Sequence, residues 1–482
     1  MRYPPEGVRR LDRAFGRSVI SRSTDQRVQL RLLSVRDWSS VRPGAPGRPR
    51  RRNSHILTTT TLQSAVFIRM SDASLLSIAL ALLLAEPCAA QWEPHQVEQL
   101  NGQADRITSP AKIQIVSRDW ELGAVHYPYL VHLPDKNSLL LLVNWGEKPH
   151  NKAGVSMSHD AGRSWTKPRL VVDSWAVGLT SLGDGNLLLV SQKSVTGPSD
   201  TYHFSRDYGE TWTESVAAPG YQGDKPFYED SQFLVDRNSR TGEVSRLWAT
   251  GKAPGKACLL RHTDDGGRTW SPLRYIPQWG RTGEIVLHRA GNGNLIAACR
   301  TNIPRFVDGK IDHWSGLGVS LSADNGKSWS DVGENILYAW GRHLSSLVTL
   351  PGGHIVLTYV VRQGYKDAAD GLPQFGIEAV VSRDYGKSWD LDHRYLLAVW
   401  KGDRKGPNAW RASGQRTATV LLPDGSLVTA FGAWYRNIAL VRWRTHDQQL
   451  TSDTTIADAS WDSDARNLFA PKISRYAITD AE

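Results

Sequence analysis

The sequence has few cysteines, and it lacks both a membrane-spanning apolar run and the usual metal and nucleotide motifs. Only 3 of its 482 residues are cysteine, so no disulfide framework is implied. The apolar run at 75–84 is too short to span a bilayer. There is no Cys/His cluster at metal-ligand spacing and no Gly-rich phosphate loop after a predicted strand. We therefore expect no cofactor and no dedicated metal site. The sequence does not exclude a Ca²⁺ ion bound by a loop.

The net charge of +10 comes entirely from the N-terminal segment 1–69. That segment holds 15 Arg, no Lys and 4 acidic residues, which leaves 43 basic and 44 acidic residues in 70–482. A nearly neutral body argues against a nucleic-acid partner. We interpret 1–69 as disordered, or as upstream sequence read from a start codon placed too early.

The apolar run 75–84 has the features of a secretory signal peptide. Small residues follow it, so we predict a signal peptide at 70–90 with cleavage near Ala90. A short buried helix is the alternative. Cleavage would make the protein secreted or periplasmic, with no stable membrane insertion. Cys258 and Cys299 would then remain, either as one disulfide or as two buried thiols.

Five copies of the motif Ser/Thr-x-Asp-x-Gly-x-Ser/Thr-Trp run through the chain. Their first residues are 47, 58, 59 and 60 positions apart, a spacing typical of propeller blades. In each copy the hydroxyl and carboxylate can bond the turn backbone, Gly can take a left-handed conformation, and Trp can pack into the blade. We therefore interpret the motifs as structural turns. They begin at Ser158, Ser205, Thr263, Ser322 and Ser382.

The predicted elements recur in the same order within each repeat. Two apolar runs joined by a Gly turn come first, a third strand leads into the motif, and a fourth strand follows it. A sixth unit at about 407–446 lacks the motif, and Ile113–Val116 could supply its outer strand. The sequence thus predicts an all-β fold, a six-bladed propeller of four-stranded antiparallel blades at 112–446. The remainder, 447–482, is predicted to be a C-terminal extension.

This arrangement resembles the sialidase (neuraminidase) superfamily, whose members carry such motifs, called Asp boxes or BNR repeats, on six-bladed propellers. The resemblance covers roughly 112–446. Asp boxes lie on the underside of the ring, so the resemblance implies that the site is on the opposite rim. That rim collects the residues that enter each first strand and those that leave each second strand.

Two segments carry the resemblance to the sialidase site. Glu284 stands before one inner strand and Arg300 after the next, as in the family, where the Glu assists a Tyr nucleophile and the Arg holds the substrate carboxylate. An Arg beside a Glu keeps that carboxylate ready to accept a proton. The second segment, Tyr228–Phe233, is similar to the one that brings an acidic group to the glycan. A simple ion pair across the rim is the alternative reading of Glu284 and Arg300.

Three family positions are occupied by other residues. His126-Tyr127-Pro128 stands where sialidases open the first blade with Arg-Ile-Pro. Glu147 could replace the acid/base Asp of the family. Gln415-Arg416 stands where the Tyr nucleophile of the family is expected. The chain therefore departs from ordinary sialidase chemistry.

We predict an exported glycoside hydrolase, similar to exo-α-sialidases, that acts on an acidic or polar glycan. Arg forks suit a carboxylate and aromatic faces suit a sugar ring. The predicted catalytic residues are Glu284, Glu229, Asp230 and Glu147. The predicted substrate-binding residues are Arg300, Arg281, Arg342, Arg362, Tyr228, His126 and Arg416. A glycan lyase on the same fold and a non-catalytic propeller that binds glycan or protein are the alternatives.

Overall fold

The computed structural model describes most of the chain between residues 91 and 446. The described residues are 91–102, 105–146, 151–192, 200–220, 226–253, 258–280, 282–301, 305–307, 310–313, 316–332, 345–363, 372–404, 409–434 and 436–446. All of them belong to one compact unit, Asp72–Glu482. The described elements are β-strands with four short 3₁₀ helices, which confirms the predicted all-β class. These helices are η1 (Pro134–Lys136), η2 (Pro277–Trp279), η3 (Leu391–His393) and η4 (Ala409–Ala412).

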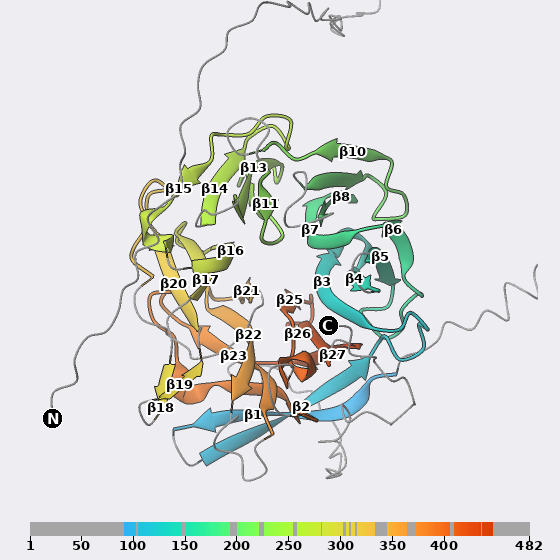
Figure 1. The fold of residues 1–482 in the computed structure, drawn as a ribbon, viewed down its shortest axis with the longest axis vertical. Coiled ribbons are helices and arrows are strands. Elements are labelled where there is room, and N and C mark those ends of the chain that lie inside the picture. The colour runs from blue at the N-terminus through green and yellow to red at the C-terminus, as the bar shows by residue number, and fades with distance from the viewer. Residues whose placement is uncertain are drawn as a thin grey trace, which may run out of the picture. The chain divides into compact units, whose positions relative to one another are not determined.

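Consecutive strands form four small antiparallel sheets (Figure 1). The first comprises β3 (Val125–Leu133), β4 (Ser138–Trp145), β5 (Lys152–Ser158) and β6 (Arg169–Val172). The second comprises β7 (Trp175–Gly183), β8 (Asn186–Gln192), β9 (Thr201–Ser205) and β10 (Glu214–Ala217). The third comprises β11 (Tyr228–Glu229), β12 (Leu234–Arg237), β13 (Val244–Lys252), β14 (Cys258–Thr263) and β15 (Arg274–Tyr275). The fourth comprises β16 (Thr282–Arg289), β17 (Leu295–Thr301) and β20 (Leu317–Ser322).

The remaining strands form a two-stranded ribbon and one nine-stranded sheet. The ribbon consists of β18 (Arg305–Val307) and β19 (Lys310–His313). The large sheet has the order β21-β22-β23-β24-β1-β2-β27-β26-β25. Its strands are β1 (Glu93–Asn101), β2 (Asp105–Ile115), β21 (Ser346–Thr349), β22 (Ile355–Gln363), β23 (Gln374–Ser382), β24 (Tyr395–Lys401), β25 (Thr417–Leu421), β26 (Leu427–Ala433) and β27 (Asn437–Trp443). Among the described residues six separate blades are therefore not seen, although the fold is propeller-like.

The β1–β2 hairpin is the reason that two expected blades merge into one sheet. Strand β2 pairs with β27, with Ile113 opposite Val441, which confirms the predicted outer strand at 113–116. Strand β1 was not predicted, and it pairs with β24 through Glu98 opposite Leu396. The hairpin thus adds hydrogen bonds across what would otherwise be an open gap between two sheet edges.

The first strands of the sheets contact one another in a closed cycle. Strand β3 contacts β7, β7 contacts β12, and β12 and β13 contact β16; β16 then contacts β21, β21 contacts β25, and β25 contacts β3. Burial on both faces explains why the inner strands barely alternate. In β4, Leu139 and Leu141 pack toward the last strands of the ring, whereas Leu140 and Leu142 pack toward β7 and β8.

The Asp boxes are hydrogen-bonded turns, as predicted. In the first box Ser158 Oγ donates to Asp160 Oδ1 at 2.8 Å and accepts a hydrogen bond from the Gly162 amide at 2.8 Å. Asp160 Oδ1 also accepts from the Ser164 amide at 2.9 Å, and Trp165 Nε1 donates to the Gly162 carbonyl at 3.3 Å. The other four boxes repeat the bond from the hydroxyl to the carboxylate.

Replacing Asp160 by Ala is expected to lower the free energy of unfolding by about 1–3 kcal/mol, because several donors lose their acceptor. Burial alone would raise the pKa of Asp160, but the bonds from Ser164 and Ser158 lower it. The stabilisation is therefore complete at pH 7, above the unfolded pKa of about 4, and is lost as the pH falls through the lowered folded value. Urea unfolding at pH 7 and at acid pH measures this, with the exposed Asp119→Ala as control. Equal unfolding free energies for both variants at pH 7 would contradict the structural role.

Candidate active site

Glu284 lies in a backbone bulge at the start of β16. The register with β17 shifts between Gly283, opposite Arg300, and Ile285, opposite Cys299, so Glu284 is the extra residue. Its φ is 48°, in the left-handed region that is costly for a residue with a side chain. The bulge directs the carboxylate to Arg300, whose Nη1 donates to Glu284 Oε1 at 3.1 Å.

The two oxygens of Glu284 have different environments. Oε1 accepts the bond from Arg300, whereas Oε2 is buried and has no hydrogen-bond partner among the residues that the structure describes. Burial raises the pKa of Glu284, and the charges of Arg300 and Lys252 offset only part of that rise. A carboxyl group with a raised pKa and one uncommitted oxygen is suited to proton transfer.

Asp230 and Lys252 reach the same place from the neighbouring sheet. Lys252 ends β13, where it pairs with Tyr228, two residues before Asp230. Lys252 Nζ lies 3.5 Å from Asp230 Oδ1, and Cys258 Sγ donates to Asp230 Oδ2 at 3.4 Å. A methyl group at Gly283 would lie 3.2 Å from Lys252 Nζ. The ammonium group of Lys252 therefore faces the bulge that contains Glu284.

Arg416 approaches from the residues before β25 and is 1% exposed. Its guanidinium carbon lies 3.7 Å from the centre of the Tyr129 ring, and its Nη2 donates to Gln232 Oε1 at 3.2 Å. Within the described part of the chain, its Nε and Nη1 have no hydrogen-bond partner. Burial lowers the pKa of Arg416, while Tyr129 and Glu284 act to raise it. Arg416 is thus a buried cation that acts electrostatically on Glu284 and has donors to spare.

Glu229 takes a different direction from its neighbour Asp230. Its side chain is fully buried, and its Oε1 accepts hydrogen bonds from Arg261 Nη2 and from the Tyr202 hydroxyl. The Glu229 amide donates to Asp200 Oδ2 at 2.8 Å. Burial and the adjacent Glu229 raise the pKa of Asp200 to about 9. Glu229 therefore belongs to an inter-sheet cluster with β9 and β14, whereas Asp230 faces Lys252.

Other predicted site residues lie in the walls of the rim. His126 packs against Trp175 with ring centres 4.9 Å apart, and burial lowers its pKa to about 4. Tyr228 and Arg362 are buried in β11 and β22. Asn144, which precedes the predicted Glu147, accepts from the Ala176 amide at 2.7 Å and links β4 to β7. Three predicted residues lie outside the described part of the chain: Glu147, Arg281 and Arg342.

Several groups at the site were not predicted as site residues. They are Cys258, Tyr129 and Gln232; the strand topology places Lys252 on the rim, but without a role in the predicted site. Gln232 carried a signal, because it lies in the segment Tyr228–Phe233. Cys258 and Tyr129 carried none, because each stands in an apolar run that reads as core. Cys258 and Cys299 are both buried and form no disulfide. Of the two alternatives predicted for them, the structure therefore shows the two buried thiols.

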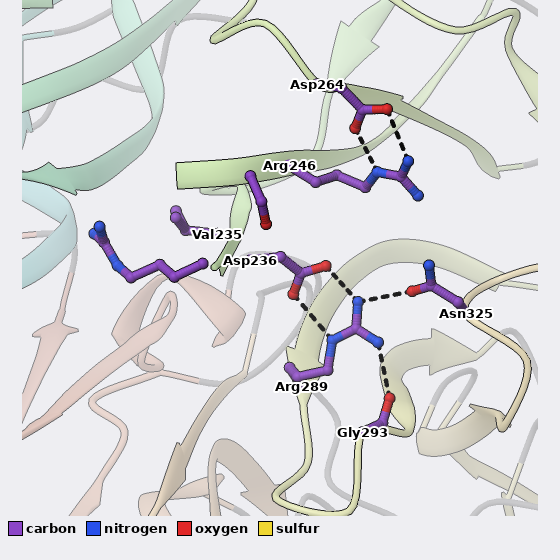
Figure 2. A pocket seen from close by; sticks show the side chains of 9 residues that line it. Val235, Asp236, Arg246, Asp264, Arg289, Gly293 and Asn325 are labelled. Carbon is purple, nitrogen blue, oxygen red and sulfur yellow. Dashed lines mark hydrogen bonds and ion pairs between the residues drawn. The ribbon is translucent and has the colours of Figure 1, made fainter. Parts of the chain in front are cut away.

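A cavity of about 820 Å³ lies at the other end of the strands (Figure 2). Arg289, which ends β16, donates through Nε to Asp236 Oδ1 at 2.9 Å. Arg246 Nη2 donates to Asp264 Oδ2 at 2.8 Å. Arg289 is five residues from Glu284, which at about 3.3 Å per residue puts the cavity roughly 16 Å along the strand. Its walls are paired Arg and Asp side chains beside two Asp boxes, so we assign it to the scaffold.

Among the described residues, no helix is long and apolar enough to cross a membrane. Within the same residues, no group of three or more His, Cys, Asp or Glu side chains could hold a metal ion.

The cycle of small sheets and the Asp-box turns define a propeller-like all-β fold, with the charged cluster at the strand ends opposite these turns. Residues 108–339 match the family described as BNR repeat-like domain. This match confirms, for that part of the chain, the resemblance to BNR-repeat proteins seen in the sequence.

Solved structures of low sequence identity are similar to this chain. A Dyadobacter fermentans protein of unknown function is 15% identical, covers 73% of this chain and 98% of its own, and has a TM-score of 0.48. A Hadza microbial sialidase is 15% identical, with coverages of 67% and 66% and a TM-score of 0.46. A Fusarium graminearum α-L-arabinofuranosidase is 16% identical, with coverages of 67% and 93% and a TM-score of 0.46. No curated protein sequence matches significantly.

Proposed function

We propose that the protein is a glycoside hydrolase that acts on an acidic or otherwise polar glycan, with Glu284 as its catalytic carboxyl group. The observation that carries this proposal is the environment of Glu284. A bulge with a left-handed φ holds the side chain, Arg300 binds one oxygen, and the other oxygen has no hydrogen-bond partner among the described residues. The conformational strain is a cost that a purely structural ion pair would not need.

Glycoside hydrolysis commonly requires two carboxyl groups around the scissile bond. Asp230 is the stronger candidate for the second group, because it shares Lys252 as an electrostatic neighbour with Glu284. Glu229 is a weaker candidate, because its Oε1 is already bound by Arg261 and Tyr202 and its side chain lies in a separate buried cluster. Its catalytic role, and that of Glu147, stay predictions.

The charges of the site favour an acidic substrate. Three cations, Lys252, Arg300 and Arg416, surround the carboxyl groups of Glu284 and Asp230. Arg300 and Arg416 would bind the carboxylate or the hydroxyl groups of the sugar. Roles in substrate binding for Arg281, Arg342, Arg362, Tyr228 and His126 stay predictions.

The proposal includes six blades and an exported protein. The nine-stranded sheet divides at the β1–β2 hairpin into β21–β24 and a group of β25–β27 with β2, which with the four small sheets makes six. Cleavage near Ala90 would leave Glu93, the first residue of β1, close to the new N-terminus. Sequencing the N-terminus of the exported protein tests this, and residues before 70 in that protein would overturn it.

Purified protein offered a panel of sialosides, uronic-acid glycans and neutral aryl glycosides tests the reaction class. We expect hydrolysis of an acidic member, seen as release of a reducing sugar. Release of an unsaturated product would identify a lyase instead. If no member is turned over but one binds in calorimetry, the propeller is a binding module.

Replacing Arg416 by Ala is expected to lower kcat/KM for the acidic substrate by roughly 10- to 100-fold, because a hydrogen bond to a charged group is lost. Neutral aryl glycosides should be affected much less. Arg416→Lys should restore only part of the loss, since an ammonium cannot reproduce the planar guanidinium fork. Steady-state kinetics on both substrate classes measure the difference, and equal losses on the two classes would contradict a role in binding the acidic group.

A further inference from the structure

Three side chains form a chain of contacts that ends at Glu284. They are Cys258 in β14, Asp230 just after β11 and Lys252 at the end of β13. We propose that Cys258, Asp230 and Lys252 are positioning residues, which together hold a fixed positive charge against Glu284. This inference rests on the proposed role of Glu284 and adds residues to it.

The first link is a hydrogen bond from a thiol to a carboxylate. Cys258 Sγ lies 3.4 Å from Asp230 Oδ2, and the cysteine is completely buried. Burial and the charge of Asp230 raise the pKa of the Cys258 thiol well above its ordinary value. The thiol therefore stays protonated and can only serve as the donor.

The second link is the ion pair between Asp230 and Lys252. With Oδ2 bound by the thiol, Asp230 presents Oδ1 to Lys252 Nζ at 3.5 Å. The Asp230 side chain is 8% exposed, whereas that of Lys252 is 35% exposed. Without a fixed carboxylate, the longer and more exposed lysine side chain would be free to turn into solvent. Burial opposes the charge of Lys252, but Asp230 raises its pKa above the ordinary value, so the ammonium is retained.

The third link is the approach of Lys252 to the bulge. Gly283 has no side chain, and a methyl group there would lie 3.2 Å from Nζ and 3.6 Å from Cε of Lys252. The next residue is Glu284, whose pKa is raised by burial, and the charge of Lys252 offsets part of that rise. The other groups that act on Glu284 come from different elements: Arg300 in β17, Arg416 before β25 and Asp230 after β11.

The second cysteine shows what a merely structural thiol looks like in this protein. Cys299 is also buried, but its Sγ lies 3.4 Å from the carbonyl oxygen of Ala297 in its own strand. It has the same size and burial as Cys258 without a bond to a carboxylate. Cys299→Ala is therefore the matched control for Cys258→Ala.

The experiment is a direct titration of Glu284 by NMR of protein carrying ¹³C-labelled glutamate carboxyls, with Glu284→Gln assigning the signal. Lys252→Met is expected to raise the pKa of Glu284 by about one pH unit, because a nearby positive charge is removed. Lys252→Arg should restore most of the original value. Cys258→Ala should produce a smaller upward shift, whereas Cys258→Ser, which keeps a donor, and Cys299→Ala should produce none.

An unchanged Glu284 titration in Lys252→Met overturns the inference, and so does an equal shift in Cys258→Ala and Cys299→Ala. If Lys252→Met does not fold, Gly283→Ala supplies the second variant, since its methyl group displaces the ammonium and should also raise the pKa. The titration needs no substrate. Glu284→Gln with full turnover would reject the proposed function while the titration still judged the positioning residues.

Discussion

Replacing Glu284 by Gln is expected to lower kcat by about 100- to 10,000-fold, the usual contribution of a positioned proton-transfer group. The amide keeps the size of the side chain and can still accept the hydrogen bond from Arg300, so the fold and the melting temperature should change little. The variant loses the ability to take up and release a proton. Steady-state kinetics on the substrate found in the panel measure the effect.

The pH dependence of the same pair of proteins gives a second readout. Burial raises the pKa of Glu284, so it keeps its proton to a higher pH than an ordinary Glu, whose pKa is about 4.3. The pH–rate profile of the wild type should therefore show a change in rate at a pH above this ordinary pKa. The profile of the Gln variant should lack that change. Turnover by the variant within a factor of about two of the wild type would remove Glu284 from the mechanism.

Replacing Glu229 by Ala is expected to lower the free energy of unfolding by about 3–5 kcal/mol, because the change leaves an uncompensated buried charge. Arg261 is 2% exposed, and its guanidinium carbon lies 4.4 Å from the centre of the Phe227 ring and 4.5 Å from that of Trp270. It cannot reach water without disrupting this packing. Denaturant unfolding at pH 7 measures the loss.

Two further variants separate the buried pair from ordinary surface charge. Glu93→Ala breaks an exposed ion pair with Arg118 and should cost less than about 1 kcal/mol. The double variant Glu229→Ala with Arg261→Met should recover part of the loss, because the unpaired charge is gone. If Glu229→Ala costs no more than Glu93→Ala, the cluster does not hold the second and third sheets together as we describe.

The parts of the fold that could be predicted are those encoded by local patterns. Each Asp box is specified within eight consecutive residues, so its turn and its hydrogen bonds follow from the sequence alone. The unalternating apolar runs likewise indicate burial on both faces. Strand β1 escaped prediction because Glu93–Asn101 has only two buried positions, Val97 and Gln99, and pairs with a strand almost 300 residues away.

The location of the site on one rim could be predicted, but the contacts between its side chains could not. Topology brings Glu284 and Asp230 to one rim, since both stand where inner strands begin. It does not tell that Glu229, one residue earlier, points into another cluster, because that depends on the face of a two-residue strand. Nor does the sequence indicate that Arg416 lies on Tyr129, a contact made across the closure of the ring.

The β1–β2 hairpin has a consequence for the order in which the chain can fold. It is synthesised before every other described strand, yet β27, which pairs with β2, is the last strand described. The Ile438 amide, for example, donates to the hydroxyl of Ser117, 321 residues earlier. Until β27 has been made, the hairpin has only one of its two neighbours, and β3 likewise waits for β25, residues 417–421. Closure is therefore a late, long-range event, and a chain whose contacts are so non-local should fold slowly.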